Sequence, residues 1–125
     1  MGRKRSRCGQ SLVEFALVLP VLVILLLGLL DLGRMYFAYV AITDAAGEGV
    51  AYGARNPTDE SGIKLRASES TEGLVEIGTD QVTVASSEDV ITVTVTYSST
   101  LITPLVRSIV PGGVMPLRAV AVQGI

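Results

Sequence analysis

Glu14 is the residue of this chain whose position most calls for a chemical explanation. It stands two residues inside an apolar run that continues from Ala16 to Leu30 without a charge. A carboxylate is costly in a membrane, so an acid here needs either a cationic partner or a route to the headgroups. Gly9 separates it from a basic segment and is a place where a leader peptide could be cut. The basic residues are Arg3, Lys4, Arg5 and Arg7.

The residue types that most catalytic and metal sites require are missing. The chain has no His, no Trp and a single cysteine, Cys8, which rules out an intrachain disulfide and a Cys/His metal cluster. Cys8 precedes the apolar run, whereas the acylated cysteine of a lipoprotein would follow it, so we interpret it as incidental. The acid pairs at 59–60 and 88–89 are typical of solvated turns. We therefore expect no enzyme, no cofactor and no metal.

Charge is distributed unevenly along the 125 residues. Residues 1–9 hold four basic residues and no acid, whereas residues 10–125 hold six basic and twelve acidic residues, a net charge of −6. A basic segment before a membrane span marks the cytoplasmic side. Residues 1–9 are therefore predicted to be a cytoplasmic basic leader. The acidic remainder argues against nucleic acid as a partner.

Residues 12–33 are predicted to form a transmembrane helix. With its flanks, the apolar run reaches about twenty residues, the length that crosses a bilayer core. No small-residue cleavage site follows it, which favours a retained anchor over a secretory signal peptide. Pro20 predicts a kink, and Gly28 and Gly33 predict either weak points or flat surfaces for close helix approach. Membrane helices also tolerate both residue types without any such role.

The helix is expected to continue beyond the membrane, so that residues 10–54 form one helix about 65 Å long. At the exit, Asp31 and Arg34 are spaced as an i, i+3 ion pair. Apolar and small residues then recur every three to four positions until Pro57. This second half stays helical only if packing rewards small side chains, and partial melting is the alternative. The small residues are Ala45, Ala46, Gly47 and Gly49.

Residues 55–125 are predicted to form an extracytoplasmic α+β domain. A short helix is expected within residues 58–73, capped by Thr58 or Asp59, with inward-facing Ile63, Ala67 and Leu74. From residue 81 the hydrophobic period changes to two, which indicates strands.

Three segments in the rest of this domain read as strands. Residues 82–84 and 90–97 alternate around a turn, and residues 114–122 offer a third strand that Pro116 places at an edge. Residues 101–110 between them are expected to form an apolar loop or a short helix. The predicted fold is α+β and pilin-like: one long N-terminal helix packed on a small antiparallel sheet of about three strands. Its inner face would be Ile91, Val93 and Val95.

The segment Gly9-Gln-Ser-Leu-Val-Glu-Phe15, together with Pro20 and residues 32–34, resembles the N-terminus of TadE-like proteins. These are minor pilins or pseudopilins of tight-adherence (Flp-type) pilus systems, and they share a type IV pilin-like N-terminus. The resemblance is strongest over residues 3–57. The chain departs from the family at Gly47, where arginine is frequent.

The resemblance implies that a prepilin peptidase cuts between Gly9 and Gln10. Glu14 would then be the fifth residue of the mature chain, and it could pair with the new α-amine of a neighbouring subunit and align the two. The implied location is the bacterial cytoplasmic (inner) membrane, crossed once, with the N-terminus in the cytoplasm and incorporation into a pilus left open.

The implied partners are the membrane, other pilins or pseudopilins, the prepilin peptidase and the inner-membrane platform of a pilus or secretion apparatus. No nucleic acid and no small-molecule substrate are expected. Two alternatives stay open. One is an uncleaved single-pass accessory protein of the same system. The other is an anchored extracellular binding module whose ligand would meet Thr92, Thr94 and Thr96.

Overall fold

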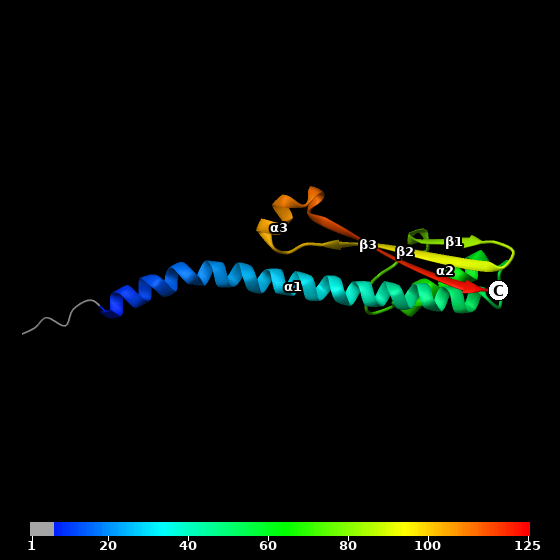
Figure 1. The fold of residues 1–125 in the computed structure, drawn as a ribbon, viewed down its shortest axis with the longest axis horizontal. Helices are drawn as coiled ribbons and strands as arrows, with labels where there is room; N and C mark the ends of the chain where they lie inside the picture. The colour runs from blue at the N-terminus through cyan, green and yellow to red at the C-terminus, as the bar shows by residue number, and fades with distance from the viewer. Residues whose placement is uncertain (1–6) are drawn as a thin grey trace, which may run out of the picture.

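The fold is dominated by one helix that extends far beyond the rest of the molecule (Figure 1). The computed structural model describes residues 7–125, so most of the predicted leader 1–9 lies outside the described residues. The long helix, α1, spans Arg7–Gly53, close to the predicted 10–54. The elements that follow are α2 (Glu60–Ser70), η1 (Thr79–Gln81), β1 (Val82–Ser86), β2 (Val90–Thr100), α3 (Pro104–Ile109), η2 (Pro111–Gly113) and β3 (Val114–Gly124).

The strands form the expected antiparallel sheet, in the order β1-β2-β3. Val82 pairs with Val95 at the start of β1, and β2 pairs with β3 along its whole length. Pro116 lies in β3, opposite Ser98. Because β3 is an edge strand, a proline that donates no ladder hydrogen bond is tolerated there. Residues 104–109 form a short helix, one of the two conformations expected for that segment.

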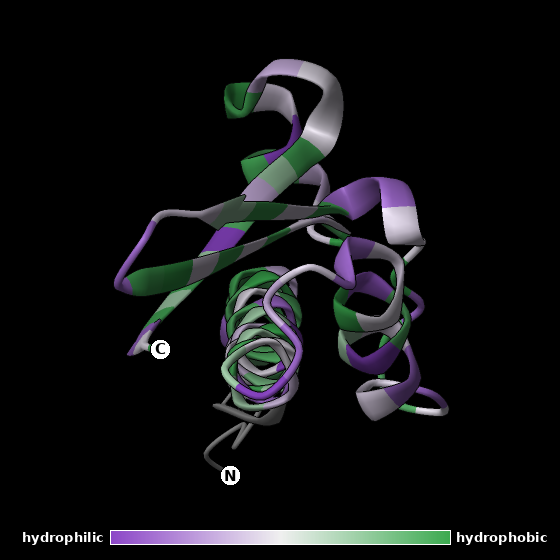
Figure 2. Ribbon diagram, turned by 90° about the vertical axis from the view of Figure 1, so that its right-hand side faces the viewer, coloured by the Kyte–Doolittle hydropathy of each residue, from purple (hydrophilic) through white to green (hydrophobic). Residues whose placement is uncertain are grey.

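The core lies between the second half of α1, one face of the sheet and α2. Figure 2 shows α1 end-on below the sheet, with α2 beside it. Ile91, Val93 and Val95 of β2 are fully buried in one cluster with Ile42 and Ala45 of α1. Burying a branched aliphatic side chain contributes about 1.5–3 kcal/mol, so this face supplies much of the domain's stability. The α+β, pilin-like arrangement is confirmed.

The junction between α1 and α2 is held by the carboxylate of Asp59. As the N-cap of α2, it accepts a hydrogen bond from the Gly62 amide at 3.0 Å, and the Tyr52 hydroxyl of α1 donates to it at 2.8 Å. The Tyr52 hydroxyl, then the Gly62 amide and the Ser61 hydroxyl, hold the pKa of Asp59 below its usual value. Asp59, one of the two caps proposed, therefore fixes where the helix begins.

The prediction for Leu74 is wrong, whereas Ile63 and Ala67 are buried as expected. The helix ends at Ser70, and the chain turns through Gly73, whose φ of 82° is a glycine conformation. Helical spacing no longer applies beyond that point. Leu74 is exposed, and its neighbour Val75 is buried instead.

The small residues in the second half of α1 fall into two groups, those packed against the core and those facing open space. Ala45 and Ala46 are buried, and a Cβ at Gly49 would lie 3.0 Å from Cγ1 of Val93. A Cβ at Gly53 would collide with Cδ1 of Ile91. Gly47, in contrast, has no atom within 4 Å of its Cβ position. The segment is helical throughout, so close packing rather than melting describes it.

We expect Gly49→Leu to destabilise the protein by about 1–3 kcal/mol because the side chain must displace Val93. Gly47→Leu is the matched control, two residues away on the open side of the same helix. It should leave stability unchanged or raise it by up to about 1 kcal/mol, through better helix propensity. Denaturant titration in detergent micelles measures both. Equal losses at the two positions would contradict the assignment of Gly49 to the packed face.

Residues 55–125 expressed alone should aggregate or stay largely unfolded, because the inner face of the sheet loses its cover. A fragment of residues 31–125 keeps the packed half of α1 and should give a cooperative thermal melt by circular dichroism. A sharp melt of the shorter fragment would show that the sheet and α2 suffice as a core.

Candidate functional site in the N-terminal helix

The first half of α1 is an apolar helix that no other part of the described chain covers. Every residue from Gly9 to Leu26 is exposed, and the helix is long and apolar enough to cross a membrane. Among residues 7–125 it is the one helix that meets this description. A helix that is apolar on all sides needs a lipid or protein environment. This suggests a single membrane anchor.

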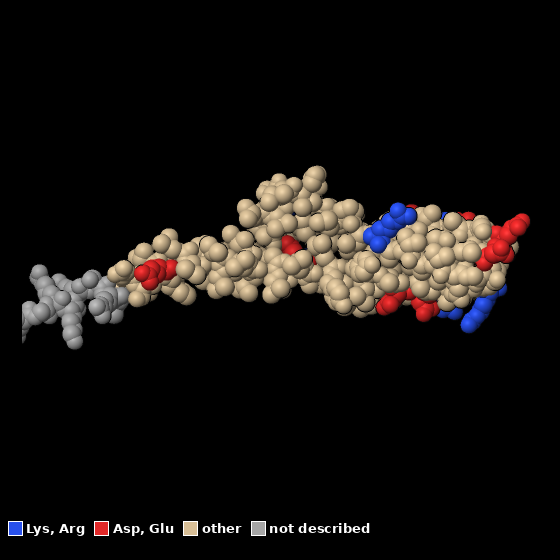
Figure 3. Space-filling view, in the orientation of Figure 1, with Lys and Arg blue, Asp and Glu red and all other residues tan. Residues whose placement is uncertain are grey.

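Glu14 lies on this apolar helix, one helical turn after Gln10. Gly9, Gln10 and Glu14 are all exposed. Glu14 is the one acid between Gly9 and Leu30, and this end of the helix shows one acidic spot in Figure 3. Within the described part of the chain, no ion pair or hydrogen bond to the Glu14 side chain is formed. Its carboxylate is therefore available to a group outside the chain.

The predicted processing bond, between Gly9 and Gln10, lies near the start of α1, which begins at Arg7. Gly9 and Gln10 thus lie in the first turn of the helix, and helix ends fray.

Three further residues singled out by the sequence lie in α1, where Pro20 and Gly33 are exposed and Gly28 is half-buried. Pro20 is inside a continuous helix, which curves over its N-terminal part in Figure 1. Gly28 and Gly33 have no atom within 4 Å of their Cβ positions. A side chain added at either position would therefore enter open space. Ala45, Ala46 and Gly49, unlike these two, are committed to the internal core.

Asp31 has a role that the sequence did not reveal. Its carboxylate is buried and accepts hydrogen bonds from the Ile102 amide at 2.9 Å, the Thr103 amide at 2.8 Å and the Thr103 hydroxyl at 2.6 Å. These donors lie more than seventy residues along the chain, after β2. Asp31 therefore ties the far end of the sheet to the apolar half of α1.

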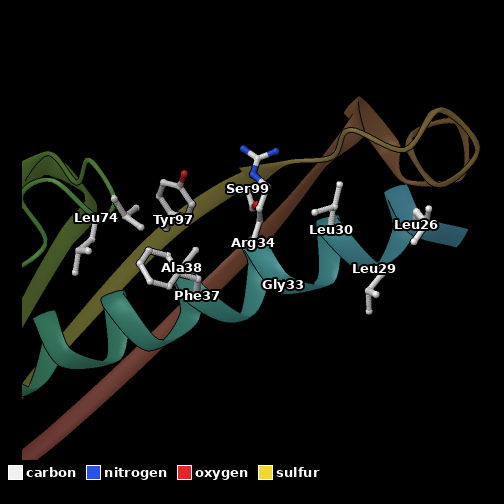
Figure 4. Close-up of a pocket in the computed structure, with 11 residues that line it drawn as sticks. Leu26, Leu29, Leu30, Gly33, Arg34, Phe37, Ala38, Leu74, Tyr97 and Ser99 are labelled. Atoms are coloured by element: carbon white, nitrogen blue, oxygen red, sulfur yellow. The ribbon is translucent and has the colours of Figure 1, made fainter. Parts of the chain in front are cut away.

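The ion pair expected between Asp31 and Arg34 is not formed; among the residues described, the one salt bridge joins Lys64 and Glu60. The amides and hydroxyl after β2 already satisfy the Asp31 carboxylate. Arg34 stays exposed and rises from α1 toward Ser99 of β2 (Figure 4). The i, i+3 spacing indicated Arg34 as a possible partner of Asp31. The partners that Asp31 actually has, Ile102 and Thr103, are brought to it by the fold.

An open groove of about 610 Å³ lies between α1 and β2, and it is largely apolar. Over the described residues, no group of three or more His, Cys, Asp or Glu could hold a metal ion. The groove thus offers a mainly apolar contact surface. Its lining residues are Leu26, Leu29, Leu30, Gly33, Arg34, Phe37, Ala38, Leu74, Val75, Tyr97 and Ser99.

Asp31→Leu should release the connection after β2 from α1, since hydrogen bonds to a charged group contribute about 1.5–3 kcal/mol each. We expect hydrogen exchange at the Ile102 and Thr103 amides to speed up at least tenfold, measured by mass spectrometry on the full chain in detergent. Arg34→Gln is the control and should leave exchange at these amides unchanged. Slow exchange in Asp31→Leu would mean that other contacts hold the connection.

Comparison with known proteins finds a similarity that is confined to α1. Neither the curated proteins nor the solved structures include a match to the chain. Residues 9–51 match the model of the TadE-like protein family. The match begins at Gly9, includes Gln10 and Glu14, and ends two residues before the end of α1. The resemblance seen in the sequence is therefore confirmed over this helix, which is similar to the TadE-like proteins.

Proposed function

We propose that this TadE-like protein is a non-enzymatic minor pilin or pseudopilin of a tight-adherence pilus or related secretion apparatus. The family match and the uncovered apolar helix support a role in pilus assembly. The observation that carries the finer proposal is Glu14, an exposed carboxylate on the apolar helix without a partner in the described chain.

In this proposal, a prepilin peptidase cuts the bond between Gly9 and Gln10. The cut removes the basic leader and leaves a positively charged amine on Gln10. Gln10 and Glu14 are separated by about 6 Å along the helix axis. An adjacent helix shifted by that distance brings its amine level with Glu14. The ion pair then offsets the cost of keeping each charge in the membrane and sets the axial register between subunits.

Residues 12–33 would hold the chain in the cytoplasmic membrane, with the basic leader inside and the α+β domain outside. The open surfaces at Gly28 and Gly33 would let neighbouring helices approach closely. Gly47 presents a third open surface beyond the membrane. Partners would be other pilins or pseudopilins, the prepilin peptidase and the inner-membrane assembly platform.

The binding-module alternative depends on the threonine row of β2. The hydroxyl of Thr96 already donates to the backbone carbonyl of Gln81 at 3.2 Å, and Thr92 and Thr94 are half-buried. The chain therefore already uses the donor of one of the three hydroxyls, and the family match over α1 favours the assembly proposal.

Mass spectrometry of native protein should find a mature chain that starts at Gln10. Glu14→Gln should be inserted and cut normally but should co-purify with partner pilins at least tenfold less, because the amide cannot neutralise an ammonium group. Glu48→Gln, an exposed acid on the same helix, is the control and should behave as wild type. A chain that retains its first nine residues would instead support the uncleaved accessory protein. Normal co-purification of Glu14→Gln would refute the pairing.

A further inference from the structure

The connection between β2 and β3, residues 101–113, projects away from the rest of the sheet and lies beside the apolar half of α1. We call this segment, which contains α3 and η2, the hairpin tip. Figure 1 shows α3 above α1, on the side toward the N-terminus and far from β1 and α2. Asp31 fixes the position of the tip through Ile102 and Thr103. The tip is thus held at the level where α1 is predicted to leave the membrane.

The surface of the hairpin tip is apolar. Ile102, Leu105, Val106 and Ile109 are exposed, the last at 76%. Between Asp89 and Arg118 the sequence contains one charged residue, Arg107. The lobe formed by this part of the chain is uncharged in the view of Figure 3, whereas Lys, Arg, Asp and Glu gather at the opposite end of the domain. An exposed apolar patch of this kind marks an interaction surface.

Many backbone amides of the hairpin tip have partners within the chain. Asp31 accepts from the amides of Ile102 and Thr103, and Pro104 and Pro111 have no amide hydrogen to satisfy. Internal hydrogen bonds use further amides of the tip, those of Leu101, Arg107, Val110 and Gly113. Lipid contact requires such internal satisfaction because hydrocarbon offers no replacement partners.

We infer that the hairpin tip is a second membrane contact, in which its exposed apolar side chains enter the outer leaflet beside α1. If α1 crosses at residues 12–33, Asp31 lies about 3 Å inside the outer boundary. Interfacial helices bury their apolar face about 5–10 Å into the region between headgroups and acyl chains. Arg107 can extend to the phosphates while its stem stays in the apolar layer. The inference rests on the proposed insertion of α1.

The occupant favoured by these observations is lipid rather than a second copy of the chain. The tip is continuous with the surface of α1 that itself faces the bilayer in the proposed function, and Asp31 holds the two together. Docked on the bilayer, the tip would restrain the tilt of the α+β domain relative to the membrane.

The test uses the full chain with Cys8→Ser, reconstituted into vesicles of phosphatidylethanolamine and phosphatidylglycerol. A single cysteine is introduced as Ile109→Cys in the tip, Val23→Cys in the span or Val122→Cys on β3, and is labelled with an environment-sensitive fluorophore. Val122 is the matched control, since it is also apolar and exposed, at 61%. Spin-labelled lipids with the quencher at a shallow or deep position report contact and depth.

The label at Ile109 should show blue-shifted emission and be quenched at least twofold more by shallow than by deep lipids, whereas the label at Val122 should behave as in water. An aqueous label at Ile109 with a quenched label at Val23 would overturn the inference and leave anchoring by α1 intact. If the label at Val23 is also unquenched, the proposed membrane insertion fails with it. A label at Ile109 that is shielded from water yet inaccessible to lipid quenchers would place protein on the tip and overturn lipid contact.

Discussion

Close contact between α1 and the central strand β2 is the constraint on which the rest of the structure depends. Gly49 and Gly53 let the helix approach so closely that added Cβ atoms would meet Val93 and Ile91. This contact covers the inner face of the sheet and mounts the whole α+β domain on a helix that continues, without a break, into the apolar segment. A domain attached in this way cannot rotate independently of its anchor. The cost in helix propensity, about 1 kcal/mol for each glycine, is offset by the buried aliphatic contacts.

Much of this fold could be predicted because it is encoded in local periodicity. Alternating Val, Ile and Thr in β2 identified both the strand and its inner face, and the three- to four-residue spacing identified the long helix. Leu74 was misplaced because periodicity cannot show where a helix ends when the cap is made by backbone groups. Gly47 and Gly49 looked equivalent in the sequence. Only the fold reveals that one is packed under Val93 and the other is open.

The candidate site likewise has a part that the sequence predicted and a part that it did not. The spacing of Gly9, Gln10 and Glu14 is local, so the sequence displayed it in full. The contact of Asp31 with Thr103 was not predictable, because nothing near Asp31 in the sequence signals a partner after β2. A useful general clue was present, however. An acid near the end of an apolar span must find donors, and a nearby basic residue is only one possible source.

Glu14 and Asp31 are the two acids within the predicted span 12–33, near its inner and outer ends, and they differ in their surroundings. Asp31 is buried and engaged by groups of its own chain, which offsets the cost of a carboxylate next to the apolar segment. Glu14 faces the same energetic problem but is exposed, and the described chain supplies no donor to it. Since the fold resolves one of these charges internally, the proposed function assigns the other a counterpart on a second molecule.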